Sequence, residues 1–80
     1  MWTEGAIGIP KKDGGYKAVR YRIKHYDVPS ECYGINGGKI SKLVLKMDGK
    51  VVASYDRGWD LDPTCEEANL ALCILLNEHN

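Results

Sequence analysis

Residues 40–55 read Ile-Ser-Lys-Leu-Val-Leu-Lys-Met-Asp-Gly-Lys-Val-Val-Ala-Ser-Tyr, and this stretch decides the fold. Two runs rich in Val, Leu and Ile flank Asp48-Gly49. This dipeptide favours a two-residue hairpin turn, because both of its positions accept the positive φ values that such a turn needs. We therefore expect one strand over residues 40–47 and a second over residues 50–55.

The same turn predicts which side chains share a face of this hairpin. Directly opposite residues on paired strands point the same way, so the turn sets the register for both strands. The expected pairs are Met47 with Lys50, Leu45 with Val52, and Leu43 with Ser54. The core face then carries Leu43, Leu45, Met47 and Val52. The opposite face carries Lys42, Val44, Lys46, Val51, Ala53 and Tyr55.

A second hairpin is expected upstream. Residues 2–9 form a strand that Pro10 ends, and Asp13-Gly14-Gly15 supplies a tight turn. Residues 16–26 then alternate with period two, as a half-buried antiparallel strand does. One face carries Val19, Tyr21, Ile23 and His25. The other carries Ala18, Arg20, Arg22 and Lys24, with Tyr16 and Tyr26 at its ends.

One helix is expected after these strands. Asp62-Pro63 reads as an N-cap and first helical residue, while Thr64 with Glu67 forms a competing capping box. Apolar residues spaced three and four apart form an inward stripe, which comprises Cys65, Ala68, Ala71, Leu72, Leu75 and Leu76. The predicted class is α+β, a four-stranded antiparallel β-meander with one C-terminal helix packed on one face (ββββα), in a single domain over residues 1–80.

Composition narrows the function classes. The chain has 80 residues, 44% hydrophobic and 28% charged, which is ordinary for a globular domain. It holds no apolar run of about 18 residues for a membrane span, and its first residues do not resemble a signal peptide. Three cysteines without paired spacing predict free thiols, packed as filler, in a reducing cytoplasm. We expect no metal site and no cofactor.

Charge is unevenly distributed along the chain. Residues 1–50 hold ten Lys or Arg against five acids, and residues 51–80 hold one against six. Either the sheet and the helix neutralise each other, or a basic surface meets an anionic partner.

The outward sheet face is the first candidate site. Its predicted basic residues are Arg20, Arg22, Lys24, Lys42 and Lys46, with no acid among them and with Tyr16, Tyr26 and Tyr55 at the border. Aromatic rings among Lys and Arg suit single-stranded nucleic acid, because bases stack on the rings and phosphates pair with the cations. The alternative is a solvated face whose lysines discourage edge pairing.

A loop and a connector give further candidates. The loop over residues 27–38 is glycine-rich at its end, but its Gly38-Lys39-Ile40 does not fit a P-loop. We expect Tyr33 from the loop and Lys39 directly after it, together with Arg57 and Trp59 from the connector, to contact a partner. Two alternatives stay open for the connector. Trp59 fills the corner between sheet and helix, or Asp56 and Asp60 act as an acid/base pair with His25.

Leu70 and Ile74 form the last candidate. They lie one turn apart on the helix side opposite the inward stripe, and exposed apolar helix residues usually mark an interface. We expect a homodimer or partner contact there.

Four blocks of residues carry a resemblance to a known family: Lys24–Asp27, Tyr33–Ile35, Gly37–Leu43 and Tyr55–Asp60. There the chain resembles short uncharacterised proteins from Firmicutes and their phages, a domain of unknown function. The match spans about residues 16–63, and Cys32 between Glu31 and Tyr33 departs from the family pattern. The resemblance implies a phage or mobile-element setting, where small proteins often block host defences.

Together these expectations give a non-enzymatic binding protein with no catalytic residues. The first hypothesis is inhibition of a bacterial defence protein, such as a CRISPR nuclease complex, by protein contact in the host cytoplasm. The alternative is a nucleic-acid-binding module that uses the basic sheet face. An enzyme is the third reading.

Overall fold

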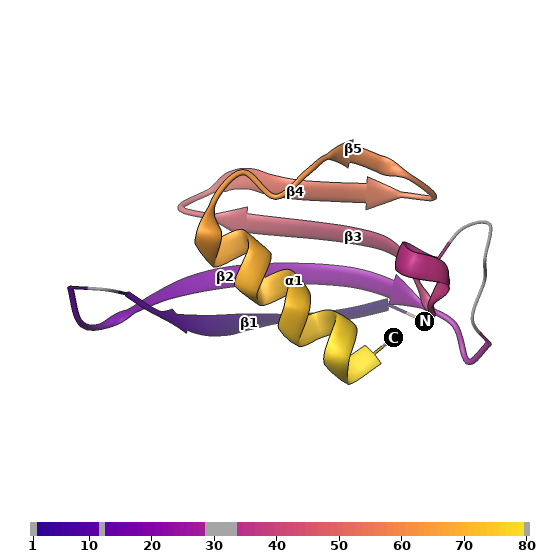
Figure 1. Ribbon diagram of the computed structural model, residues 1–80, viewed down its shortest axis with the longest axis horizontal. Helices are drawn as coiled ribbons and strands as arrows, with labels where there is room; N and C mark the ends of the chain where they lie inside the picture. Colours follow the sequence, from indigo (N-terminus) through magenta and orange to yellow (C-terminus); the bar gives the residue numbers. More distant parts are fainter. Residues whose placement is uncertain (1, 12, 29–33, 80) are drawn as a thin grey trace.

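In the computed structural model, which describes residues 2–11, 13–28 and 34–79, a five-stranded sheet carries one helix on one of its faces (Figure 1). Its elements are β1 (Trp2–Pro10), β2 (Tyr16–His25), the 3₁₀ turn η1 (Ile35–Gly37), β3 (Ile40–Met47), β4 (Lys50–Asp56), β5 (Trp59–Leu61) and α1 (Glu66–His79). The strands follow chain order and neighbours are antiparallel. The α+β class is confirmed, while the expected four strands become five.

The additional strand, β5, occupies the segment expected to be an irregular connector. Arg57 adopts a positive φ of 60°, which is uncommon outside glycine, and reverses the chain together with Gly58. The Arg57 N–H donates to the Ser41 carbonyl at 3.1 Å and so ties this turn to β3. β5 has three residues, too few for a period-two pattern to be recognised.

The β3–β4 hairpin turns as expected, but its register changes one residue later. Asp48 and Gly49 both have positive φ, 55° and 78°, and Met47 pairs with Lys50. Leu45 then pairs with Ala53, because Val52 has no partner and forms a β-bulge. The expected Leu45–Val52 pairing is therefore wrong.

The bulge changes which side chains of β4 are buried. Beyond it, residues that alternation placed outward turn to the core. Ala53 is 0% exposed and Tyr55 is 7% exposed, against the expectation that both point outward. Val52 stays buried, as expected, and Val51 stays exposed. β4 therefore contributes more to the core than a regular strand of its length.

The β1–β2 hairpin is regular throughout. Its register runs without a break from Trp2 opposite Lys24 to Pro10 opposite Tyr16. Val19 and Ile23 are fully buried on the inner face, as predicted. Because β1 pairs along its whole length, it extends both faces of the sheet by one strand.

Helix α1 packs across the inner face over β1, β2 and β3 (Figure 1). It begins at Glu66, later than either predicted cap, and ahead of it the Thr64 N–H donates to the carbonyl of the bulge residue Val52 at 2.9 Å. The inward stripe is confirmed. Ala68, Ala71 and Leu75 are fully buried, and the partly buried members that pack against the core are Cys65, Leu72 and Leu76.

Two described cysteines are free thiols. Cys65 is partly buried against the core, which fits the expected role as filler, whereas Cys73 is exposed on the helix and does not. Cys32 lies outside the described residues.

Candidate functional site

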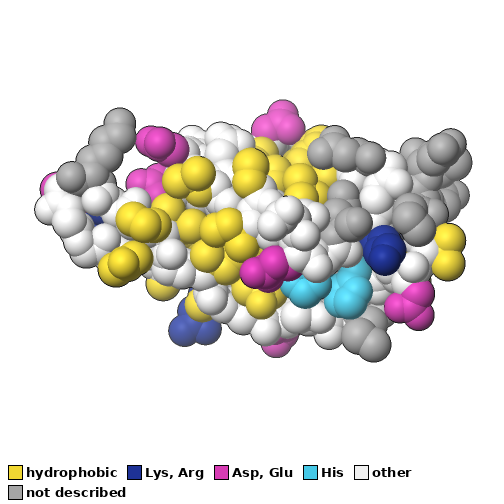
Figure 2. Space-filling model, turned by 60° about the horizontal axis from the view of Figure 1, so that its bottom comes forward, with side chains coloured by type: hydrophobic (Ala, Val, Ile, Leu, Met, Phe, Trp, Pro, Cys, Tyr) yellow, Lys and Arg dark blue, Asp and Glu magenta, His cyan; other side chains and the backbone are white. Residues whose placement is uncertain are grey.

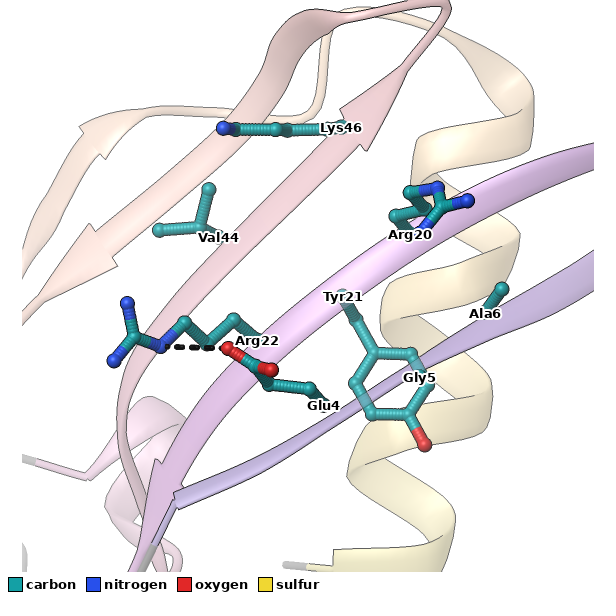
Figure 3. A pocket seen from close by; sticks show the side chains of 8 residues that line it. All are labelled: Glu4, Gly5, Ala6, Arg20, Tyr21, Arg22, Val44 and Lys46. Carbon is teal, nitrogen blue, oxygen red and sulfur yellow. Dashed lines mark ion pairs between the residues drawn. The ribbon is translucent and has the colours of Figure 1, made fainter.

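The sheet face opposite α1, called the outer face below, brings together the five predicted basic residues. Arg20, Arg22 and Lys24 alternate along β2, and Lys42 and Lys46 do so along β3. The register places Arg20 opposite Lys46 and Lys24 opposite Lys42. In Figure 3 the side chains of Arg20, Arg22 and Lys46 stand on this face, with α1 behind the sheet.

Acidic residues also lie on the outer face, which corrects the expectation of a field without acids. Glu4 of β1 stands opposite Arg22, and its Oε1 lies 3.1 Å from the Arg22 Nε. Asp56 of β4 stands opposite Lys42, and its Oδ1 lies 3.8 Å from the Lys42 Nζ. These pairs partly neutralise the middle and one end of the face, so its positive charge is smaller than the count of Lys and Arg suggests.

Trp2 is a functional candidate that sequence reasoning missed. It stands opposite Lys24 and is 45% exposed. The guanidinium carbon of Arg22 lies 4.5 Å from the centroid of the Trp2 ring, and the Lys24 Nζ lies 5.9 Å from it. Both are cation–π distances. Counting back through the Asp13-Gly14-Gly15 turn would have placed Trp2 beside these cations.

Tyr26 continues this aromatic end of the outer face. It is 48% exposed, and the Lys24 Nζ lies 5.5 Å from its ring centroid. A hydrogen bond with Lys24 is the largest cause that lowers the pKa of the Tyr26 hydroxyl, and the positive charges of Lys24 and Arg57 add to it. Of the other tyrosines expected at the border, Tyr16 is exposed but Tyr55 is buried on the inner face.

A hollow of about 650 Å³ lies on the outer face between β1, β2 and β3. Its apolar part is formed by Ala6 and Val44 beside Gly5 (Figure 3). Its charged part comprises Glu4, Arg20, Arg22 and Lys46. The face therefore offers an open surface that is apolar at Ala6 and Val44 and is bordered by three cations and one carboxylate.

The loop and connector candidates are only partly joined to this face. Arg57 is exposed and close enough to Tyr26 to affect its pKa. Lys39 is partly buried, and its carbonyl accepts the Tyr26 N–H at 3.0 Å. Trp59 packs edge-on against Tyr55, with ring centroids 5.1 Å apart, and so lies away from the outer face. Tyr33 lies outside the described residues.

Leu70 and Ile74 are exposed, 43% and 38%, as their spacing predicted. Leu70 also lines a smaller hollow of about 280 Å³ with Ile9 and Pro10. Figure 2, which brings the bottom of the Figure 1 view forward, shows most of the exposed hydrophobic side chains in its left and upper parts, with a further group at the right edge. Together Leu70 and Ile74 give the helix an apolar outer side, called the helix patch below.

His25 and His79 lie together where the end of β2 meets the end of α1 (Figure 2). Their ring centroids are 5.2 Å apart, and His25 Nε2 lies 3.0 Å from Thr3 Oγ1. The pKa of His25 is lowered, first by burial and next by the charges of His79, the amino terminus and Lys39, against the opposing effect of Asp27.

A family model described as "Domain of unknown function (DUF7678)" matches residues 1–80. The chain belongs to this family. No curated protein and no solved structure matches the chain significantly.

The family description names no activity. Within the described part of the chain, no three or more His, Cys, Asp or Glu residues are grouped as a metal site would need. Among the same residues, no helix has the length and apolar character of a membrane span.

Proposed function

We propose that this member of the family is a non-enzymatic binding protein whose outer face binds single-stranded nucleic acid. The observation that carries the proposal is the exposed Trp2 ring with Arg22 and Lys24 above it, beside an exposed Tyr26. Such a group offers a stacking surface and cations within one contact area.

The chemistry of single strands fits this group. Unpaired bases expose flat faces that stack on aromatic rings, and each stacked base contributes about 1–3 kcal/mol. The adjacent backbone phosphates pair with Lys and Arg. In a duplex the base faces are already stacked on one another, so Trp2 and Tyr26 would have no partner. We therefore expect the protein to prefer single strands.

The ion pairs of the outer face predict a moderate electrostatic contribution. Glu4 and Asp56 already pair with Arg22 and Lys42, so a bound phosphate would have to compete with these carboxylates. The expected salt dependence is smaller than five Lys and Arg residues would give, and a larger share of the affinity should come from stacking.

Fluorescence anisotropy with labelled oligonucleotides tests the proposal. We expect binding of a mixed-sequence single strand at about 50 mM salt, weaker binding as salt rises, and weaker binding of the matching duplex. No binding of the single strand at about 50 mM salt refutes the proposal. Equal affinity for single strand and duplex would mean that base stacking on Trp2 and Tyr26 does not contribute to binding.

A second candidate is an inhibitor of a bacterial defence system that acts by protein contact. The helix patch favours it, because Leu70 and Ile74 expose apolar surface that a protein partner would cover. This proposal includes an origin in Firmicutes or their phages and a site of action in the host cytoplasm, and it names a defence nuclease complex as the partner.

A pull-down from a bacterial lysate, read by native mass spectrometry, separates the two candidates. A co-purified nuclease subunit that the Leu70→Glu/Ile74→Glu variant no longer retains supports the inhibitor. Bound oligonucleotide that this variant still retains supports the outer face instead. A nuclease subunit retained equally by both proteins contradicts a role for the helix patch.

A further inference from the structure

Arg20 and Lys46 stand directly opposite each other across β2 and β3, and both are exposed. Like charges in directly opposed positions of a sheet destabilise it. Their other neighbours in register offer no relief, since Ala6 pairs with Arg20 in β1 and Val51 pairs with Lys46 in β4. Among the described residues, no acid forms an ion pair with either cation.

The second like-charge pair on the outer face is different. Lys24 stands opposite Lys42, but Lys42 pairs with Asp56, and Lys24 lies over the rings of Trp2 and Tyr26. The fold thus supplies its own counter-groups at one end of the face. At the other end it leaves two cations facing each other.

The space around this unrelieved pair is shaped to hold a ligand. Arg20 and Lys46 border the 650 Å³ hollow, which Ala6 and Val44 line on either side of the pair and which Glu4 and Arg22 line further along (Figure 3). A guanidinium and an ammonium can together bind the oxygens of one phosphate. A bound anion would also remove the repulsion between the two side chains.

We propose that Arg20 and Lys46 form a phosphate-binding subsite in this hollow. The assignment rests on the proposed function, because it makes the subsite the place where a nucleic-acid backbone is held. Lys24 lies four residues further along β2, about 13 Å away at the rise of a strand. A bound strand would therefore run along β2, with a phosphate at Arg20 and Lys46 and bases at Trp2 and Tyr26.

The salt dependence of oligonucleotide binding tests the subsite. The variant is Arg20→Gln/Lys46→Gln. The matched control is Lys11→Gln/Lys50→Gln, which removes the same charge at exposed positions outside the hollow. For one lost phosphate contact we expect the slope of log affinity against log salt to fall by about 0.7, and to stay unchanged in the control. If the wild-type protein binds but the variant keeps its slope, the subsite is overturned while the proposed function stands.

A titration with inorganic phosphate, followed by nuclear magnetic resonance of the labelled protein, separates the two failures. We expect backbone shifts at Arg20, Val44 and Lys46 that vanish in the glutamine variant. If the wild-type protein binds no oligonucleotide, these shifts show that the subsite takes free phosphate although the proposed function has failed. If neither oligonucleotide nor phosphate binds, both proposals are overturned.

Lys46→Glu distinguishes a lost binding site from a misfolded protein, because it should raise stability while it weakens binding. Replacing the like-charge pair by an opposite-charge pair should raise the thermal midpoint by about 1–5 °C. The same change should weaken oligonucleotide or phosphate binding by tenfold or more. A variant that loses both stability and binding, or that keeps its binding, contradicts the assignment.

Discussion

The two faces of the sheet are built from the same strands and have opposite characters. Along β2 and β3, Val19, Ile23, Leu43 and Leu45 are 0% exposed beneath α1. On the outer face Arg20 and Arg22 alternate with the buried residues of β2, and Lys42, Val44 and Lys46 alternate with those of β3. Because side chains alternate along a strand, residues adjacent in sequence point to opposite faces of the sheet. The inner face stabilises the fold, and the outer face stays exposed.

The comparison also shows where the outer face ends. In β4 the bulge at Val52 turns Ala53 and Tyr55 to the core, so this strand adds mainly Asp56 to the charged surface. The outer face is therefore widest over β1, β2 and β3, where alternation is unbroken apart from the last residue pair of β2 and β3.

The largest expected effect is on stability, and it should differ sharply between two adjacent residues of β3. Leu45→Ala should lower the free energy of unfolding by about 2–5 kcal/mol, since the buried side chain leaves a cavity. Val44→Ala, on the outer face, should have a much smaller effect. Denaturant unfolding followed by circular dichroism measures both. Equal losses would mean that the two faces do not divide stability as described.

The next effect concerns binding. Trp2→Ala should weaken single-stranded oligonucleotide binding by about 5- to 150-fold, the loss of one stacked base. The control is Trp59→Ala, which removes the other tryptophan and its edge contact with Tyr55. It should leave affinity unchanged. Anisotropy titrations of both variants decide the matter, and a greater loss of affinity in the control would place the stacking surface elsewhere.

A smaller effect on stability is expected when the pH changes, because His25 at the edge of the inner face gains or loses a proton. Burial lowers the pKa of His25 below its ordinary value of 6.5, so the unfolded chain binds a proton more readily than the folded protein. Stability should be highest above about pH 6.5 and should decrease as the pH falls toward the lowered pKa. Thermal midpoints measured between about pH 8 and pH 5 test this. His25→Gln should flatten the profile, and an equally steep profile in that variant would assign the effect to other groups.

The smallest effect on stability is expected at the helix patch, which belongs to neither sheet face. Leu70→Glu/Ile74→Glu should change the free energy of unfolding by no more than about 0.5 kcal/mol for each exposed site. If the patch joins two copies of the chain, light scattering should give the variant half the mass of the wild-type protein. An unchanged mass together with unchanged partner retention contradicts an interface.

Much of the candidate site was predictable, because its residues obey local periodicity. The alternation in residues 16–26 and 40–47 placed all five cations on one face, and the register confirms their neighbourhood. The ion pairs of Glu4 and Asp56 and the position of Trp2 were not predicted. Glu4 and Trp2 lie on β1, and the sequence did not show which of its side chains share a face with the cations. Asp56 lies one residue beyond the expected end of its strand.

By itself, the sequence determined the turn at Asp48-Gly49, the inward stripe of the helix and the α+β class. These features depend on conformational preferences and spacings within a few residues. Only the tertiary structure decided that Val52 forms a bulge and that its carbonyl accepts the Thr64 N–H ahead of α1. It also decided that β5 pairs with β4 and that Arg20 faces Lys46 without an acid partner among the described residues. Such contacts join residues far apart in the chain, where local preference carries no information.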